Sequence, residues 1–301
     1  MTTKDVPTPD LRIVPTASLK PHEEHDSQRS APLIESLKTA RFMINPPLVA
    51  PMGNGDYVIL DGANRAYCFS ALDYPHILVQ VASYESGLVD LDNWQHVVAG
   101  WNIDAFLQQL RAMPEITLAE GDAPDLINDI SLGEGDADHA LTLHEFSPVD
   151  DERDEALAQM YLRDGRVVSI YAPNSSLHER NAALRKVVAV YQTHAALHRT
   201  TLVDTDEVWS LYPDAIALVI FERYTPRDII DAAREYAYLP PGISRHIVNG
   251  RAIRVNYPLD NLRDAGKDLD EKNMILRQWM QQKLANRQVR FYAEGTYQFD
   301  E

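Results

Sequence analysis

Asp61-Gly62-Ala63-Asn64-Arg65 stands between two stretches of contrasting pattern. The preceding Tyr57-Val58-Ile59-Leu60 is a short apolar run typical of a buried strand, and residues 65–72 have helical spacing. A strand, a glycine turn and a helix start can bind an anion, because backbone N–H groups and the helix dipole point the same way. The Arg65 guanidinium adds a planar fork suited to phosphate oxygens. The stretch therefore predicts a site for a phosphorylated ligand, most simply a nucleotide; a purely structural Asp-Gly turn is the alternative.

The composition is that of a globular protein and excludes several function classes. The chain has 301 residues, of which 45% are hydrophobic and 24% charged, enough for one large or two ordinary domains. A net charge of −17 without a Lys/Arg cluster argues against nucleic acid as a partner. A single cysteine, Cys68, allows no intrachain disulfide, and no apolar run reaches the length of a signal or membrane segment. We therefore expect a cytoplasmic protein with no membrane partner.

Short patterned segments predict a mixed α/β (α+β) protein. In the first hundred residues, a hairpin turn at 53–56 joins two of the strands, and the expected elements are strands at 11–14, 46–50, 57–60 and 78–81 with helices at 32–39 and 65–72. An acidic stretch with glycines and a proline follows, which predicts a connecting region with a short helix or two. The last part predicts strands at 166–171, 215–221 and 289–297, a hairpin of 245–248 with 251–257 across Asn249-Gly250, and helices at 179–197, 227–237 and 272–285.

Polar clusters outside the turn suggest chemistry. In His22-Glu23-Glu24-His25 the histidines are three apart, unlike the metalloprotease helix pattern, which disfavours zinc. A loop carboxylate beside an anion-binding turn suits a general base, and a solvated acidic turn that caps the next helix is the alternative. Arg29 either reaches the same phosphate or lies on the surface.

Two further clusters have the composition of a small-ligand pocket. Asn93-Trp94-Gln95-His96 sets an indole beside polar side chains, which can wall a pocket, although a lone tryptophan is more often core. Pro241-Gly242-Ile243-Ser244-Arg245-His246 begins with a turn whose backbone N–H groups, with Ser, Arg and His next to them, could hold a carboxylate.

These motifs together resemble a known family. Their order and spacing are similar to those of the ParB/sulfiredoxin-like nucleotide-binding domain and, within that superfamily, of the SbnI-type free L-serine kinases, which make O-phospho-L-serine, in some bacteria for siderophore biosynthesis. The resemblance covers nearly the whole chain except about 119–151. It is carried by Leu19, Pro21-His22-Glu23-Glu24, Arg29, Pro47-Leu48-Val49, Val58-Ile59-Leu60-Asp61-Gly62, Asn64-Arg65, Asn93-Trp94-Gln95-His96, Leu239-Pro240-Pro241-Gly242-Ile243-Ser244-Arg245, Leu276-Arg277-Gln278-Trp279 and Lys283-Leu284-Ala285-Asn286.

The resemblance implies a domain order and a reaction. A nucleotide-binding domain of the ParB/sulfiredoxin-like type is expected at 11–114, an acidic connecting region at 115–155, and an α+β domain that completes the substrate pocket at 156–301. The implied reaction is phosphoryl transfer from ATP or ADP to the hydroxyl of L-serine. A homodimer is compatible with the resemblance.

The resemblance also implies roles for individual residues. Glu23 is the implied catalytic base, and Asp61 is implied to hold or orient Mg²⁺, directly or through water. The implied phosphate-binding residues are Gly62, Asn64, Arg65 and Arg29. The residues implied to shape the serine pocket are His22, Trp94, Ser244, Arg245 and His246.

The sequence departs from the family at one site residue, and it leaves two other functions open. The family usually has histidine at the position of Asn64, and an asparagine can donate a hydrogen bond to a phosphate but carries no charge. A nucleotide-binding ParB-like transcriptional regulator would need a basic DNA-reading surface, which the charge of −17 disfavours. A nucleotide or amino-acid sensor without kinase activity is the third reading.

Overall fold

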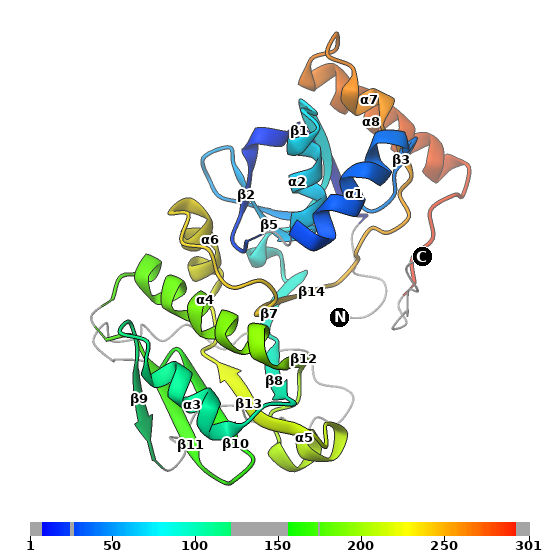
Figure 1. Cartoon of the computed structure of the whole chain (residues 1–301). Helices are drawn as coiled ribbons and strands as arrows, with labels where there is room; N and C mark the ends of the chain where they lie inside the picture. The colour runs from blue at the N-terminus through cyan, green and yellow to red at the C-terminus, as the bar shows by residue number, and fades with distance from the viewer. Residues whose placement is uncertain (1–7, 25–26, 122–155, 174, 293–301) are drawn as a thin grey trace. The chain divides into compact units, whose positions relative to one another are not determined.

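The computed structural model describes residues 8–24, 27–121, 156–173 and 175–292 (Figure 1). The chain forms two compact units. Unit 1 takes its residues from 1–90 and 246–301, and unit 2 from 91–245. Within the described residues, no helix has the length and apolar character needed to cross a membrane.

Unit 1 is built on a mixed five-stranded sheet with helices packed on it. The strand order is β1-β6-β4-β5-β2, in which β1/β6 and β4/β5 are antiparallel and β4/β6 and β2/β5 are parallel. The strands are β1 (Asp10–Pro15), β2 (Leu19–Pro21), β4 (Leu48–Pro51), β5 (Tyr57–Asp61) and β6 (His76–Val81). The helices are α1 (Ser27–Thr39), α2 (Ala63–Ala71), α7 (Asp260–Arg263) and α8 (Leu269–Ala285), with short 3-10 turns η1 (Thr16–Ser18) and η2 (Tyr84–Ser86).

The C-terminal part of the chain completes the fold of unit 1. Helix α8 packs against the edge strand β1 (Figure 1), and the Asn273 side chain bonds to both the N–H and the C=O of Ile13, at 2.9 and 2.8 Å. β15 (Tyr257–Pro258) pairs with β3 (Phe42–Met43). Tyr257, Leu262 and Leu276 lie in the same buried cluster as the sheet residues Ile13 and Val79. The two chain segments of unit 1 therefore share one core.

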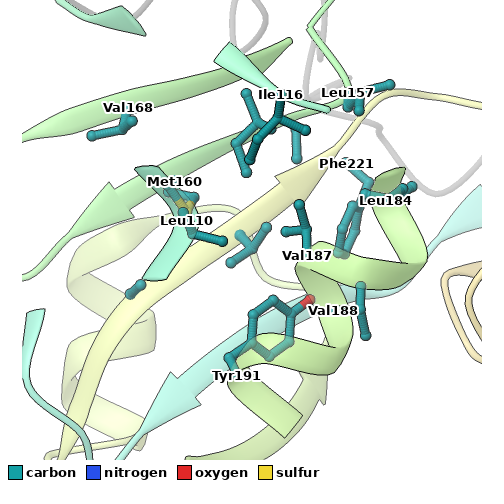
Figure 2. Close-up of a cluster of buried hydrophobic side chains, with 14 of the residues drawn as sticks. Leu110, Ile116, Leu157, Met160, Val168, Leu184, Val187, Val188, Tyr191 and Phe221 are labelled. Carbon is teal, nitrogen blue, oxygen red and sulfur yellow. The ribbon is translucent and has the colours of Figure 1, made fainter. Parts of the chain in front are cut away.

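Unit 2 contains an antiparallel six-stranded sheet. The order is β12-β8-β13-β10-β11-β9. The strands are β8 (Gln95–Ala99), β9 (Thr117–Glu120), β10 (Ala158–Leu162), β11 (Val167–Tyr171), β12 (Ala196–Thr200) and β13 (Ala215–Phe221), and the helices are α3 (Ile103–Arg111), α4 (Leu177–His194), α5 (Thr205–Leu211) and α6 (Pro226–Arg234). Side chains of α3 and α4 fill the main core against the sheet (Figure 2), while Val208 and Trp209 of α5 belong to a second cluster. β7 (Val89–Asn93) pairs with β14 (Ser244–Val248), and the unit boundary falls within both strands.

The mixed α/β class is confirmed, but the compact units differ from the expected division at 114 and 155. Strand β8, from within the expected first domain, pairs with β12 and β13 from the expected last one. The segment after residue 245 returns to unit 1, where α8 covers β1. Most of the acidic connecting region lies outside the described residues, and its beginning forms β9.

One predicted hairpin is wrong, and one predicted strand is wrong over the part that the structure describes. The segment 245–248 does not pair with 251–257, because β14 pairs with β7, and the left-handed backbone of Arg254 (φ +50°) and Asn256 (φ +55°) cannot continue an extended strand. Residues 289–292 form no strand, and 293–297 lie outside the described residues.

Candidate functional site

The turn between β5 and α2 has the geometry of an anion site. Gly62 has φ +89° and ψ 29° and is the N-cap of α2. Because glycine has no side chain, the N-cap residue offers no side-chain acceptor to the N–H groups of the first helical turn. A Cβ at this position would come within 3.1 Å of Arg65 Nη2 and 3.2 Å of the Pro47 Cα. Backbone conformation and space therefore both select glycine here. Asn64 and Arg65 lie in the first turn of the helix, where backbone N–H groups point out of the helix end.

Asp61, the last residue of β5, is paired with two arginines. Its Oδ2 lies 2.8 Å from Arg251 Nη2 and 3.5 Å from Arg65 Nη2. Partial burial raises the pKa of Asp61, but the two guanidiniums and the Gly62 N–H outweigh it and hold the pKa below its ordinary value. Because the side chain is 54% exposed, this ionised carboxylate remains open to a ligand.

Both arginines are anchored on the chain just before β4. Arg65 Nη1 donates to the Asn45 carbonyl, and Arg251 Nη2 donates to the Pro46 carbonyl at 2.7 Å. Their guanidiniums are thus held beside the glycine turn by backbone acceptors. Arg251 was not among the predicted site residues.

The parallel pairing of β2 with β5 brings His22 and Glu23 to the end of the sheet where the turn lies. His22 is buried, and its Nδ1 lies 2.7 Å from the Ile59 carbonyl, to which it donates. The ring is thereby oriented so that Nε2 lies 3.6 Å from Glu23 Oε1. The Glu23 side chain is 17% exposed. A carboxylate largely withdrawn from water and next to an oriented imidazole can accept a proton from a hydroxyl.

His246 enters the same group from the C-terminal segment of unit 1. Its ring makes an edge contact with His22, 5.5 Å between centroids, and its Nε2 lies 2.7 Å from the Tyr84 hydroxyl. Burial, followed by the neighbouring His22, lowers the pKa of His246 to about 3, although Glu23, Asp61 and a hydrogen bond with the Leu60 backbone act in the opposite direction. Burial also raises the pKa of Tyr84, so its hydroxyl keeps its proton and donates to a neutral His246.

Unit 2 holds the other predicted pocket residues. The Arg245 guanidinium lies 4.9 Å from the centroid of the Trp94 ring, and its Nη1 donates to Asp92 Oδ2 at 3.2 Å. The backbone N–H of Trp94 donates to the Ile243 carbonyl at 2.7 Å, and Ser244 begins β14. Trp94 is therefore a partly exposed platform for an arginine rather than a core residue.

Gln95 and His96, the neighbours of Trp94, are core residues. Both lie in β8, where His96 is fully buried between the Tyr191 and Phe221 rings and its Nδ1 is 2.6 Å from the Tyr191 hydroxyl. This strand was not predicted; the Val-Val-Ala run that follows His96 is the sequence signal that could have revealed it.

The structure thus groups the predicted residues into two sets, one in each unit. Unit 1 brings together His22, Glu23, Asp61, Gly62, Asn64, Arg65 and His246; unit 2 brings together Trp94, Ser244 and Arg245. Arg29 lies in α1, and its side chain is outside those that the structure describes. Arg251, Tyr84 and Gln80 were missed, and no local motif marks them.

Comparison with known proteins agrees with this architecture. No protein-family model matches the chain. Over 293 residues it is 24% identical to the ATP-dependent L-serine kinase SbnI of Staphylococcus aureus, covering 95% of this chain and 96% of the relative. The solved structure of SbnI with a C-terminal truncation, also from Staphylococcus aureus, superposes with a TM-score of 0.62 at 21% identity, covering 93% of this chain and 97% of that one. A free serine kinase in complex with AMP gives a TM-score of 0.63 at 17% identity over 86% of this chain and 96% of that one.

The chain has the fold of the free serine kinases. The predicted resemblance to the SbnI-type free serine kinases is thereby confirmed over nearly the whole chain. These matches cover 86–93% of the chain, so they extend over both units.

Proposed function

We propose that the chain is a free L-serine kinase, which transfers the terminal phosphoryl group of a nucleotide to the serine hydroxyl and releases O-phospho-L-serine. The observation that carries the proposal is the grouping of Glu23 with the β5–α2 turn in a chain similar to an L-serine kinase over 95% of its length. SbnI is named as ATP-dependent, which favours ATP over ADP as the donor.

The nucleotide phosphates would bind at the start of α2. Gly62 allows close approach of the backbone, and Asn64 and Arg65 stand in the first helical turn. Because phosphoryl transfer passes through a loose transition state, positioning and charge neutralisation supply most of the catalysis. Asn64 in place of the family's usual histidine leaves the charge neutralisation to the arginines.

Glu23 would act as the base for the serine hydroxyl. Its carboxylate is oriented beside the His22 ring, which the Ile59 carbonyl fixes in place. His246 is neutral at pH 7, so it offers the reacting groups a hydrogen-bonding ring rather than a competing cation. Glu23 would accept the hydroxyl proton as the serine oxygen attacks the phosphorus.

The residues at the turn fit Mg²⁺. Within the described residues, no three His, Cys, Asp or Glu side chains gather into a metal-binding group. Magnesium, however, is usually held by one or two carboxylates together with substrate phosphates and water. Asp61 is ionised, partly exposed and next to the proposed phosphate site, so it would hold Mg²⁺ directly or through water. The ion would supply neutralisation of the phosphate charge.

The serine-binding residues remain those predicted. Arg245, aligned by Trp94 and Asp92, has the chemistry to bind the serine carboxylate, and Ser244 adds a hydroxyl next to it. His22 and His246 also stay predicted serine-binding residues. A cytoplasmic location and a homodimer also stay predictions.

Mass-spectrometric detection of O-phospho-L-serine tests the proposal. The purified protein is incubated with Mg²⁺, ATP or ADP, and L-serine, L-threonine or L-homoserine in separate reactions. We expect phosphoserine with ATP and little product from the other two amino acids. Nucleotide binding without any phosphorylated amino acid would contradict the proposal and favour a sensor.

A further inference from the structure

The chain returns to the glycine turn 190 positions after Asp61, and a buried glutamine fixes it there. Gln80 of β6 is 4% exposed. Its Nε2 donates to the Gly250 carbonyl at 2.9 Å, and its Oε1 accepts from the Ala252 N–H at 2.8 Å and from Arg251 Nη1 at 3.1 Å. One side chain therefore holds the backbone on both sides of Arg251 and the Arg251 guanidinium itself.

The Arg251 guanidinium is oriented by four acceptors. In addition to Gln80, it donates to the Pro46 carbonyl at 2.7 Å, to Asp61 Oδ2 at 2.8 Å and, more weakly, to the Ala252 carbonyl at 3.4 Å. The Arg251 side chain is 20% exposed, whereas Asp61 is 54% exposed. The guanidinium plane is thus fixed by backbone and Gln80 acceptors, and its remaining partner is the exposed carboxylate of Asp61.

Two guanidiniums meet one carboxylate at the turn. Arg65 alone could neutralise the Asp61 carboxylate, yet Arg251 is paired with it as well, in a chain whose net charge is −17. A second planar fork beside the N-terminus of α2 suits the oxygens of a phosphorylated ligand.

We infer that Arg251 is a second phosphate-binding residue of the nucleotide site, and that Gln80 is the positioning residue that holds it there. The ligand class is a nucleoside di- or triphosphate. The inference rests on the proposed function for the nature of the ligand.

The test is calorimetric binding of ADP and of adenosine to the full chain. Arg251→Gln removes the charge, and Arg277→Gln makes the same charge change on the exposed face of α8 in the same unit. Loss of one charge-assisted hydrogen bond predicts ADP binding weakened about tenfold or more in Arg251→Gln, with adenosine affinity within about twofold of wild type. Arg277→Gln should bind both as wild type does.

Two further variants separate phosphate binding from a general structural role. Gln80→Met should also weaken ADP binding, and adding it to Arg251→Gln should cause little further loss, because both act through one guanidinium. Arg251→Lys, which keeps the charge but not the fork, should fall between Arg251→Gln and wild type. Unchanged ADP affinity in Arg251→Gln, or equal losses for ADP and adenosine, would overturn the inference.

The outcome also separates this inference from the proposed function. ADP binding that depends on Arg251 in a protein that does not phosphorylate serine would uphold the inference and reject the kinase. Serine phosphorylation with ADP binding indifferent to Arg251 would do the reverse.

Discussion

Gly62→Ala tests whether the glycine turn is built around its neighbours. An L-residue with left-handed backbone costs about 1–2 kcal/mol, partly offset by about 0.4–1 kcal/mol from the stiffer unfolded chain. The new Cβ would also stand 3.1 Å from Arg65 Nη2 and 3.2 Å from the Pro47 Cα. The arginine tip can move, but the Pro47 backbone must shift, at a cost of about 1–2 kcal/mol. We expect the free energy of unfolding to fall by about 2–3 kcal/mol, and ADP affinity to fall with it.

Gly55→Ala is the matched control. Gly55 has a similar φ of +90°, but a Cβ there would meet nothing within 4 Å. This variant should lose about 1 kcal/mol or less in urea unfolding and should keep wild-type ADP affinity. Equal losses of stability in the two variants would refute the contact argument. Wild-type ADP affinity in Gly62→Ala would refute the assignment of this turn to the phosphates.

The remaining predictions concern three other residues. The pKa of His246 is about 3 in the folded chain, against an ordinary 6.5, so between these values the unfolded chain binds a proton that the folded chain does not. The free energy of unfolding, measured in urea, should therefore fall from pH 6.5 toward pH 3, and less steeply in His246→Gln. An equal dependence of this free energy on pH in both proteins would contradict a neutral His246 ring. Trp94→Leu should raise the KM for serine about tenfold in steady-state assays, whereas an unchanged KM would leave Trp94 with packing alone. Asn273→Ala should lower the free energy of unfolding in urea by about 1–3 kcal/mol, because both Ile13 backbone groups lose a hydrogen-bond partner. The control is Gln278→Ala, at an exposed position of the same helix. An equal loss in the two variants would show that the Asn273–Ile13 hydrogen bonds do not hold α8 on β1.

The central turn was predictable from sequence because its signals are local. An apolar run, Asp-Gly and a helical pattern follow one another within sixteen residues, and the structure has β5, Gly62 and α2 at those places. The same holds for Pro226, a proline at a helix start, which begins α6 as expected. Each of these elements is decided by neighbouring residues.

The parts that were missed depend on contacts between distant segments. Nothing near Arg251 marks it as a partner of Asp61, because their contact arises only when the C-terminal segment returns to unit 1. The false hairpin at Asn249-Gly250 shows the same limit, since a favourable turn dipeptide was outweighed by the pairing of β14 with β7. His96 looked like a ligand-binding side chain beside Trp94, and its burial in β8 follows from the sheet that forms around it.

Glu23→Gln tests the central claim most directly. The measurement is the initial rate of O-phospho-L-serine formation at saturating ATP and serine, with ADP affinity measured on the same preparation. Because glutamine keeps the shape of the side chain but cannot accept the hydroxyl proton, we expect the rate to fall by about 10²–10⁴-fold while ADP affinity stays near that of wild type. A variant that forms phosphoserine within about tenfold of the wild-type rate would contradict the assignment of Glu23 as the base.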